Sequence, residues 1–378
     1  MKKYIYFDNA ATTIGKPECV SRAVIAALEN SGNPGRSGHD ISVNAASEIY
    51  NCRKAVCRMF GYDAPERVVF TCNATYALNA AIKGYVTKDS HILISNLEHN
   101  SVIRPVHALS ENQSTNISYS IFDATGSEQE IIYDFISKIR KNTKMAVVTM
   151  ASNVSGKILP ISKIAQICKS RGILIICDAS QSAGCVPVNV KSLGVDVLCF
   201  AGHKSLYGPQ GTGGAVFCCN QEPECIIEGG NGVNSTDKVM SGLLPERLEA
   251  GTLNTPGISG LAAGIEYVSK IGINEIFERN TTLINKLTEN LMNIEGVTLY
   301  GLSNIRVPTV IFNVKGMCSE EAANALNERR ICVRGGFHCA PLAHAAYSTG
   351  DCGAVRASLT FKNTFAEIDA FSLAINRI

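Results

Sequence analysis

The sequence predicts an α/β protein with a mostly parallel sheet between helices, joined to a smaller α+β domain. Short β-branched runs alternate with longer segments of helical period, which is typical of this class. The runs are almost continuously apolar, as strands covered on both faces should be. A chain of 378 residues is also long enough for two domains with a sizeable core.

Five apolar runs are predicted as buried strands of this sheet. In chain order they are 67–71, 91–95, 145–149, 173–177 and 195–200. Helices are predicted between them at 74–83, 128–141 and 161–171. The last of these is followed by Gly172, and glycine is a common signal for the end of a helix.

Two loop-like segments interrupt the alternation of predicted strands and helices. Residues 228–236 and 251–257 are rich in residues that break regular structure, and a helix is predicted from about 258 to 270. We therefore expect a large α/β domain over residues 15–257. Residues 1–14 together with 258–378 are expected to form the small α+β domain.

Composition and charge exclude several classes of protein. The 35 basic and 33 acidic residues leave a net charge of +2, which gives no electrostatic footprint for nucleic acid or an anionic membrane. No apolar run approaches the length of a membrane span, and the N-terminus does not resemble a signal peptide. We therefore expect a cytoplasmic protein whose 15 cysteines are reduced and mostly packed in the core. Their spacing does not match a zinc site, so no metal is expected.

Two polar residues follow predicted strands at the edge where open α/β sheets bind ligands. Asp178 comes directly after strand 173–177, and Lys204 follows strand 195–200. A lysine can form a Schiff base, and an aspartate can keep a pyridinium nitrogen protonated. Each residue also has an ordinary interpretation, Asp178 as a turn cap and Lys204 as a solvated lysine. Together they favour a site for pyridoxal phosphate.

A phosphate cradle is predicted where strand 67–71 runs into a helix. Ala74 and Thr75 lie at the start of that helix, where unpaired backbone N–H groups bind phosphate. The Thr75 hydroxyl adds a further donor. An Asn or Thr before a helix is also an ordinary N-cap. The phosphate interpretation is favoured because Asp178 and Lys204 already indicate a pyridoxal phosphate site.

Ordered motifs cover almost the whole chain. They are YFDNAATT at 6–13, LEHN at 97–100, SNVSG at 152–156, DASQ at 178–181, GHK at 202–204, EAGT at 249–252, RGGFHCA at 334–340 and RASL at 356–359. In this order and spacing the sequence resembles the class V aminotransferase-fold enzymes, and within them the cysteine desulfurases and selenocysteine lyases of the Suf-type group. The resemblance implies a pyridoxal phosphate-dependent transferase of fold type I.

The resemblance also implies a role for each matching residue. Lys204 would bind the cofactor covalently and move the substrate's α-proton, while His99 would stack on the cofactor ring and take part in proton transfer. The other implied cofactor contacts are Ala74, Thr75 and His203 at the phosphate, Asp178 at the ring nitrogen, and Gln181 and Asn153 at the ring oxygen. The implied substrate contacts are Arg356 at the carboxylate, with Asn153, His39 and Ala11 beside it. Thr252 would reach the phosphate from the opposite subunit of a homodimer.

Cys339 is the residue implied as nucleophile. It follows Gly335 and Gly336 in a loop and stands beside His338, and a cysteine near an imidazole and an arginine can have its thiolate favoured. We therefore expect a sulfurtransferase, a cysteine desulfurase that converts L-cysteine to L-alanine and leaves a persulfide on Cys339. The compact loop resembles the group that hands its sulfur to a separate acceptor protein, as in iron–sulfur cluster assembly.

Two residues depart from the pattern of the resembled family. Ala201 stands where a Ser or Thr commonly donates a hydrogen bond to the phosphate, so cofactor retention is expected to be weaker. Phe337 stands where many Suf-type enzymes have a second histidine, so one face of the Cys339 loop is expected to be apolar.

Three other functions remain open at this point. L-selenocysteine could be the substrate on the same scaffold, because selenium leaves more readily than sulfur. Another class V reaction, such as transamination or kynureninase-like cleavage, would use Lys204 and leave Cys339 idle. A catalytically lapsed scaffold protein is the alternative without enzyme activity, and the intact Lys204, Asp178, Arg356 and Cys339 speak against it.

Overall fold

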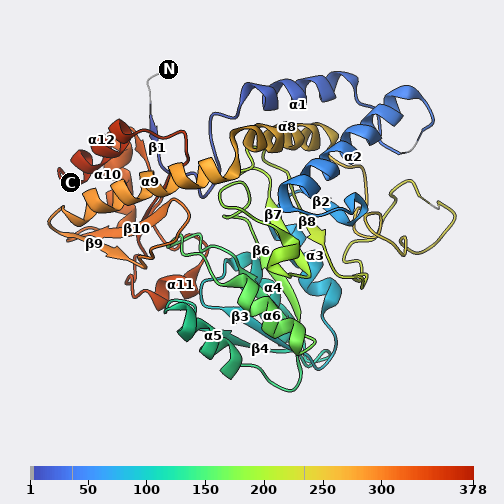
Figure 1. The fold of residues 1–378 in the computed structure, drawn as a ribbon, viewed down its shortest axis with the longest axis horizontal. Coiled ribbons are helices and arrows are strands. Elements are labelled where there is room, and N and C mark those ends of the chain that lie inside the picture. Colours follow the sequence, from blue (N-terminus) through green and yellow to red (C-terminus); the bar gives the residue numbers. More distant parts are fainter. Residues whose placement is uncertain (1–3, 36, 234) are drawn as a thin grey trace.

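The computed structural model describes residues 4–35, 37–233 and 235–378. The larger part of the molecule is a sheet covered by helices, and a smaller part lies beside it and contains the C-terminus (Figure 1). The strands are β1 (Ile5–Tyr6), β2 (Val68–Thr71), β3 (His91–Ser95), β4 (Ser118–Phe122), β5 (Thr143–Thr149), β6 (Leu174–Asp178), β7 (Val197–Ala201), β8 (Gly213–Phe217), β9 (Val297–Tyr300), β10 (Thr309–Val314), β11 (Ile331–Cys332) and β12 (Val355–Ser358). The α-helices are α1 (Glu18–Asn30), α2 (Asp40–Phe60), α3 (Ala74–Tyr85), α4 (Asn100–Glu111), α5 (Glu128–Ser137), α6 (Ile161–Ser170), α7 (Val190–Leu193), α8 (Thr255–Ile271), α9 (Ile273–Met292), α10 (Ser319–Glu328), α11 (Pro341–Ala346) and α12 (Phe365–Ile375), and a 3₁₀-helix spans Pro65–Arg67.

The main sheet has seven strands in the described part of the chain, in the order β2-β8-β7-β6-β5-β3-β4. Strand β8 runs antiparallel to β2 and β7, and the other neighbours are parallel. The five predicted strands correspond to β2, β3, β5, β6 and β7, and the predicted helices to α3, α5, α6 and α8. The predicted α/β class with a mostly parallel sheet is therefore confirmed.

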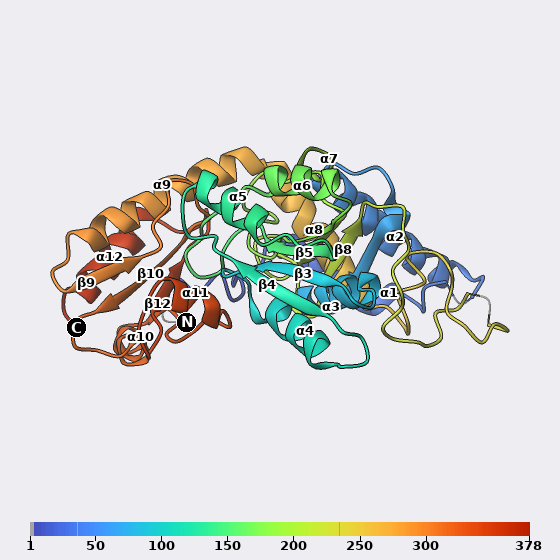
Figure 2. The same ribbon diagram turned by 90° about the horizontal axis from the view of Figure 1, so that it is seen from below.

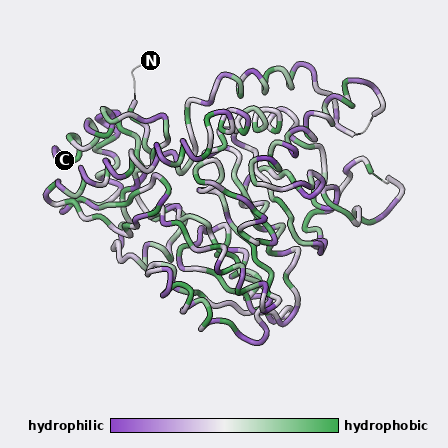
Figure 3. The backbone as a smooth tube through the Cα atoms, in the orientation of Figure 1, coloured by the Kyte–Doolittle hydropathy of each residue, from purple (hydrophilic) through white to green (hydrophobic). Residues whose placement is uncertain are grey.

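Helices cover both faces of this sheet because successive strand residues point to opposite sides. Leu93 of β3 belongs to a buried cluster that includes Phe135 of α5. The next residue, Ile94, belongs to a different cluster, on the side of Leu78 from α3. In Figure 3 hydrophobic residues concentrate along the central strands, while the outer helices alternate between hydrophilic and hydrophobic.

The smaller part is an α+β unit built from both ends of the chain. Strands β9, β10 and β12 form an antiparallel sheet, and β1 pairs in parallel with β11. The Phe371 ring packs against Phe7 and Phe312, with ring centroids 5.3 and 6.0 Å apart. Figure 2 shows this unit at one end of the molecule, with α9 running from it towards the large sheet. The N-terminal strand is thereby tied to the C-terminal part of the fold.

The predicted domain boundary between residues 257 and 258 falls inside α8. Helix α8 packs along α1 and α2, and its Leu261 belongs to the core of the large sheet. Leu287 of α9, in contrast, belongs to the core of the smaller unit. We therefore propose that the division lies at Gly272, between α8 and α9. Residues 1–3 of the predicted small domain lie outside the described residues.

Candidate active site

A cavity of about 220 Å³ opens at the carboxyl ends of β5, β6 and β7, next to the smaller unit. Parallel strands bring their following residues together at this edge, which is where open α/β sheets bind ligands. Most of the site residues expected from the sequence line this one cavity. They are Ala11, Ala74, Thr75, His99, Asn153, Asp178, Gln181, His203, Lys204 and Arg356.

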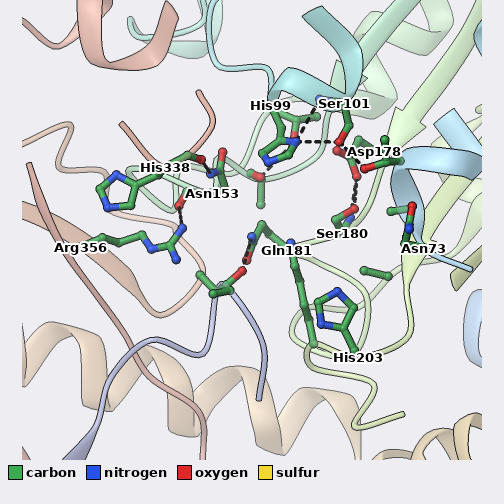
Figure 4. Close-up of a pocket in the computed structure, with 18 of the residues that line it drawn as sticks. Asn73, His99, Ser101, Asn153, Asp178, Ser180, Gln181, His203, His338 and Arg356 are labelled. Carbon is green, nitrogen blue, oxygen red and sulfur yellow. Dashed lines mark hydrogen bonds between the residues drawn. The ribbon is translucent and has the colours of Figure 1, made fainter. Parts of the chain in front are cut away.

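Asp178 ends β6 and is buried in the cavity wall. Its Oδ1 atom accepts hydrogen bonds from the Ser180 backbone N–H at 2.8 Å and from the Ser180 hydroxyl at 2.5 Å. These two donors hold the carboxylate in one orientation (Figure 4). A fixed anion at this position fits the ring nitrogen of a pyridinium cofactor.

Lys204 follows β7 by three residues and lines the same cavity. Burial lowers the pKa of its amine to about 8, and the Arg356 charge adds to this effect, while the Asp178 carboxylate opposes it. A larger share of the amine is therefore neutral near pH 7 than for an exposed lysine. A neutral amine is the form that reacts with a carbonyl group and accepts a proton.

His99 is the N-cap residue of α4 and directs one ring nitrogen into the cavity. Its Nδ1 atom accepts a hydrogen bond from the Ser101 backbone N–H at 3.0 Å. The proton of the neutral ring is therefore on Nε2. Burial and the neighbouring Lys204 charge lower the pKa of His99 to about 4. A neutral, uncharged ring at this position suits stacking against an aromatic cofactor.

The anion cradle is predicted at the first turn of α3. Helix α3 starts at Ala74, and its first backbone N–H groups have no partner within the helix, as at every helix start. Strand β8 lies close against this turn, because a Cβ atom on Gly213 would lie 2.7 Å from the Asn73 carbonyl carbon. Only a glycine allows this approach. The opening beside Ala74 and Thr75 therefore fits a phosphate group.

His203 lies on the opposite side of the cavity from His99 (Figure 4). Its Nδ1 atom is 3.1 Å from the Thr12 hydroxyl oxygen. Burial and the neighbouring Lys204 charge lower its pKa to about 4, so the ring is neutral. Ala201 also lines the cavity, and it presents a methyl group where the resembled family commonly has a hydroxyl. Together with the Asp178 carboxylate and the α3 cradle, these residues fit pyridoxal phosphate.

Arg356 is buried on β12 and is a cationic residue that lines the cavity from the smaller unit. Its Nη2 atom lies 2.8 Å from Asp8 Oδ1, and its Nη1 atom donates to the Asn153 carbonyl oxygen at 3.1 Å. Its Nε atom is buried and makes no hydrogen bond within the described residues. Burial lowers the pKa of the guanidinium, and the Asp8 carboxylate opposes this shift. The unpaired buried donor fits a carboxylate ligand.

Cys339 lies in the loop between β11 and α11, at the rim and not in the wall of the cavity. Its thiol is exposed. Its carbonyl oxygen accepts a hydrogen bond from the Asn100 backbone N–H at 2.7 Å, and the Asn153 side chain donates to the His338 carbonyl oxygen at 2.8 Å. The loop is therefore bound to two elements of the large domain, each beside a cavity residue.

His338 does not activate Cys339 as expected from the sequence. The ring is buried, its Nε2 atom is 3.0 Å from the Arg334 carbonyl oxygen, and its Nδ1 atom is 3.0 Å from His344 Nε2. Burial and the nearby Arg356 charge lower the pKa of His338 to about 2. Both ring nitrogens are occupied and the ring is neutral, so it neither takes the thiol proton nor supplies a charge.

Two expected site residues lie away from the cavity in the single chain. His39 is exposed and serves as the N-cap of α2, where its Nδ1 atom accepts a hydrogen bond from the Ser42 backbone N–H at 3.3 Å. Thr252 is exposed and lines a different cavity of about 360 Å³, together with Arg53 and Glu249. The expectation for Thr252 concerns a second subunit, and it stays a prediction.

Several cavity residues were not assigned a role from the sequence. Among them are Asn73, Ser101, Ser180 and Arg334. Ser180 and Ser101 could have been found, because each follows an assigned residue by two positions near the end of a predicted strand. Within the described residues no group of three or more His, Cys, Asp or Glu side chains could hold a metal ion. No helix in that part of the chain is both long and apolar enough to cross a membrane.

Several known proteins are similar to this chain in sequence and in overall structure. The structure of an apo cysteine desulfurase from Thermococcus onnurineus NA1 is 31% identical and superposes with a TM-score of 0.90, covering 99% of this chain and 94% of that one. A probable cysteine desulfurase of Xylella fastidiosa (strain Temecula1 / ATCC 700964) is 32% identical over 100% of this chain and 91% of its own length. A probable cysteine desulfurase of Mycolicibacterium paratuberculosis is 31% identical, and the chain spans 56% of that relative.

The family comparison covers nearly the whole sequence. The model of the family "Aminotransferase class-V" matches residues 5–371, which include the large sheet, the cavity and the Cys339 loop. The fold and the convergence of Asp178, Lys204 and Arg356 on one cavity agree with that match. The chain belongs to the class V aminotransferase family.

Proposed function

We propose that this protein is a pyridoxal phosphate-dependent cysteine desulfurase, which converts L-cysteine to L-alanine and keeps the sulfur on Cys339. The observation that carries the proposal is the attachment of the Cys339 loop to the cavity. The Cys339 carbonyl oxygen is bound by the residue next to His99, and the His338 carbonyl oxygen is bound by Asn153. An exposed thiol is thus fixed at the rim of a cavity that contains Lys204 and Arg356.

The cavity residues divide the work of holding the cofactor. The α3 turn at Ala74 and Thr75, with His203, would hold the phosphate, and Asp178 would pair with the ring nitrogen. His99 would lie on the ring face, while Gln181 and Asn153 would contact the ring oxygen. When bound, pyridoxal phosphate supplies an aldehyde that condenses with amines and a ring that draws electrons from a neighbouring carbon.

The remaining cavity residues act on the amino acid substrate. Arg356 would bind the carboxylate through its planar donor face, with its orientation fixed by Asp8 and by the Asn153 carbonyl oxygen. Lys204, whose pKa of about 8 leaves part of the amine neutral, would move the proton at the substrate's α-carbon. Ala11 lines the same cavity and would lie beside the bound amino acid.

Cys339 would carry out the sulfur-transfer step. Its thiolate attacks the substrate sulfur, and a sulfur–sulfur bond forms while the substrate's carbon–sulfur bond breaks. The electron pair of the broken bond goes to the substrate carbon, which takes up a proton and becomes the methyl group of alanine. A thiol of an acceptor protein then removes the sulfur and restores Cys339. We propose that this reaction takes place in the cytoplasm, because a persulfide on an exposed cysteine needs reducing surroundings. We further propose iron–sulfur cluster assembly as the use of the transferred sulfur.

We also propose that the active form is a homodimer in which Thr252 reaches the phosphate site of the partner subunit. Exposed apolar side chains on α1 and α2 support a covered face, among them Ile25, Leu28 and Ile41 at 54%, 68% and 54% exposure. Thr252 lines a cavity together with Tyr50 and Arg53 of α2. Sedimentation velocity of the purified protein and of a Leu28→Glu variant tests this. A wild-type monomer, or a variant as dimeric as the wild type, contradicts it.

The decisive experiment is mass spectrometry of the purified protein after treatment with L-cysteine. One added sulfur on the peptide containing Cys339, with alanine as product, is the expected result. The Cys339→Ser variant is expected to lose alanine formation by at least about 100-fold, while the exposed Cys72 replaced by Ser serves as control. Alanine formation at the wild-type rate in Cys339→Ser would overturn the proposal. Parallel turnover of L-selenocysteine shows which of the two substrates is preferred.

A further inference from the structure

A chain of three buried side chains lies directly behind the Cys339 loop. It consists of His338, His344 on α11 and Thr349, which are 3%, 2% and 4% exposed. His338 Nδ1 is 3.0 Å from His344 Nε2, and His344 Nδ1 is 2.9 Å from the Thr349 hydroxyl oxygen. At its other end, His338 Nε2 is 3.0 Å from the Arg334 carbonyl oxygen. None of the activities considered above assigns a role to His344 or Thr349.

The direction of every hydrogen bond in this chain follows from its first member. A carbonyl oxygen only accepts, so His338 Nε2 carries a proton and donates a hydrogen bond to the Arg334 carbonyl oxygen. The neutral His338 ring then accepts at Nδ1, and His344 must donate from Nε2. The neutral His344 ring accepts in turn at Nδ1, from the Thr349 hydroxyl. The chain is therefore fully satisfied in one arrangement of protons.

Both imidazoles must be neutral for this arrangement to hold, and their surroundings keep them so. Burial and the nearby Arg356 charge lower the pKa of His338 to about 2 and that of His344 to about 4. Arg334 adds to the effect on His338. The Phe337 ring covers His344 edge-on, with ring centroids 5.4 Å apart, and excludes water from that side. The chain therefore acts as a fixed structural link and not as a proton relay.

The backbone that this link supports is in an unfavourable conformation. His338 and Cys339 have φ angles of +51° and +55°, in the left-handed region that residues with a side chain rarely occupy. Two such residues in succession persist only where surrounding contacts hold them. The backbone carbonyls of both residues are held by Asn153 and Asn100. The His338 side chain is the third attachment, and it depends on His344.

We propose that His344 is a positioning residue for the sulfur-transfer step, because it fixes His338 and thereby the backbone that aims the Cys339 thiol at the cavity. Thr349 acts one step further back by fixing the proton on His344. Neither side chain touches the substrate or the reacting sulfur atoms. The inference rests on the proposed function for the meaning of the thiol's position, but the link itself is a property of the free chain.

The test compares three variants of the holoenzyme with the wild type. His344→Phe keeps the ring and removes both hydrogen bonds, His344→Gln restores a donor towards His338, and Thr349→Val removes the hydroxyl alone. His107, an exposed histidine on α4, is replaced by Gln as the control. The single-turnover rate of sulfur transfer to Cys339 is measured by mass spectrometry, alongside the KM for L-cysteine and the absorption spectrum of the bound cofactor.

Sulfur transfer is expected to fall about 100-fold in His344→Phe, as for a reacting group displaced by about 1 Å. The KM and the cofactor spectrum should stay unchanged, and His344→Gln should recover most of the rate. Amide hydrogen exchange of the apo protein provides a readout independent of activity. Exchange should rise about 10-fold or more in the peptide spanning 337–349 of His344→Phe and stay unchanged elsewhere.

Unchanged exchange in that peptide, or an unchanged sulfur-transfer rate, in His344→Phe overturns the proposal. Equal losses in the Phe and Gln variants, with a changed cofactor spectrum, also overturn it, since they indicate general damage to the fold. If His344→Phe does not fold, Thr349→Val decides, with an expected loss of about 10-fold and faster local exchange. A wild-type protein that forms no persulfide refutes the proposed function instead, and the exchange result then still decides whether the link holds the loop.

Discussion

Arg356 Nη2 and Asp8 Oδ1 lie 2.8 Å apart in the cavity wall, although 348 positions separate the two residues in the chain. The Asp8 carboxylate accepts a hydrogen bond from Nη2, and the Asn153 carbonyl oxygen accepts one from Nη1. The buried Nε has no hydrogen-bond partner within the described residues. Arginine has five N–H groups, so the ion pair orients a cation that keeps further donors for a ligand. A planar, charge-assisted contact of this kind is what distinguishes arginine from lysine.

Arg356→Lys is therefore expected to weaken substrate binding. A lysine keeps the charge but loses the fork of donors, which costs about 1.5 to 3 kcal/mol for a hydrogen bond to a charged group. The KM for L-cysteine should rise about 10- to 100-fold. Steady-state kinetics measure this, with Arg22→Lys as the control because the Arg22 side chain is 75% exposed. A KM within twofold of the wild type in Arg356→Lys would show that Arg356 does not bind the carboxylate.

Because Glu98 is a buried carboxyl group with a raised pKa, we expect the protein to lose stability as the pH rises. Burial raises its pKa from 4.5 to about 8, and its Oε2 atom has no hydrogen-bond partner within the described residues. The folded state therefore binds a proton more tightly than the unfolded state, and stability falls as pH rises from about 4.5 to about 8. Glu98→Gln mimics the protonated form and should remove this fall.

The measurement is urea unfolding of wild type and Glu98→Gln at pH 5.5 and pH 8.5. We expect the variant to gain on the order of 1 to 3 kcal/mol relative to the wild type between the two pH values. Glu111→Gln, at an exposed position on α4, should show no such gain. A difference between variant and wild type that is equal at both pH values contradicts the prediction.

The buried Arg53–Glu249 ion pair should be essential for the stability of the large domain. Its atoms pair at 2.6 and 3.0 Å, and Glu249 Oε1 also accepts from the Phe70 backbone N–H at 2.7 Å. Glu249→Ala leaves a buried guanidinium unpaired, which costs about 3 to 5 kcal/mol. The exposed Arg58–Glu266 pair gives the control, because Glu266→Ala should cost at most about 1 kcal/mol. Urea unfolding compares the two, and equal costs would refute the prediction.

Adding a hydroxyl group at Ala201 tests where the phosphate of the cofactor binds. Ala201→Ser places a hydroxyl at the cavity wall, where it can donate to the bound phosphate. One such hydrogen bond contributes about 0.5 to 1.5 kcal/mol, so the Kd for pyridoxal phosphate should fall about 2- to 10-fold. Fluorescence titration of the apo protein measures the Kd, with Ala201→Val as a variant that adds bulk without a donor. An unchanged or weaker affinity of the Ser variant would mean that the phosphate lies elsewhere.

Five strands of the main sheet and most of the cavity could be predicted because both follow from local patterns. Asp178 and Lys204 follow apolar runs, and parallel strands bring such residues to one edge. Strand β8 was not predicted, since Gly213 and Gly214 weaken the strand pattern. In the structure Gly213 lets β8 approach the start of α3. The same glycine therefore weakens the strand pattern in the sequence and allows the close packing beside the predicted phosphate site.

The contacts between the two units could not be predicted from the sequence. The pairing of Asp8 with Arg356 depends on the packing of β1 against β11 and of β12 against β10, which no local pattern specifies. The occupation of His338 Nδ1 depends on where α11 places His344. Proximity in sequence suggested that His338 acts on Cys339, whereas the ring points away into a closed hydrogen-bond chain.

The separation of Asp8 and Arg356 along the chain also sets an order of events during synthesis. The ribosome releases the N-terminal part first, so the α3 turn, Asp178 and Lys204 are all made long before β12 emerges. With the proposed roles, a chain that stops before residue 356 has the residues of the cofactor site but lacks Arg356, the proposed contact of the substrate carboxylate. Chains truncated before β12 are therefore expected not to turn over free cysteine.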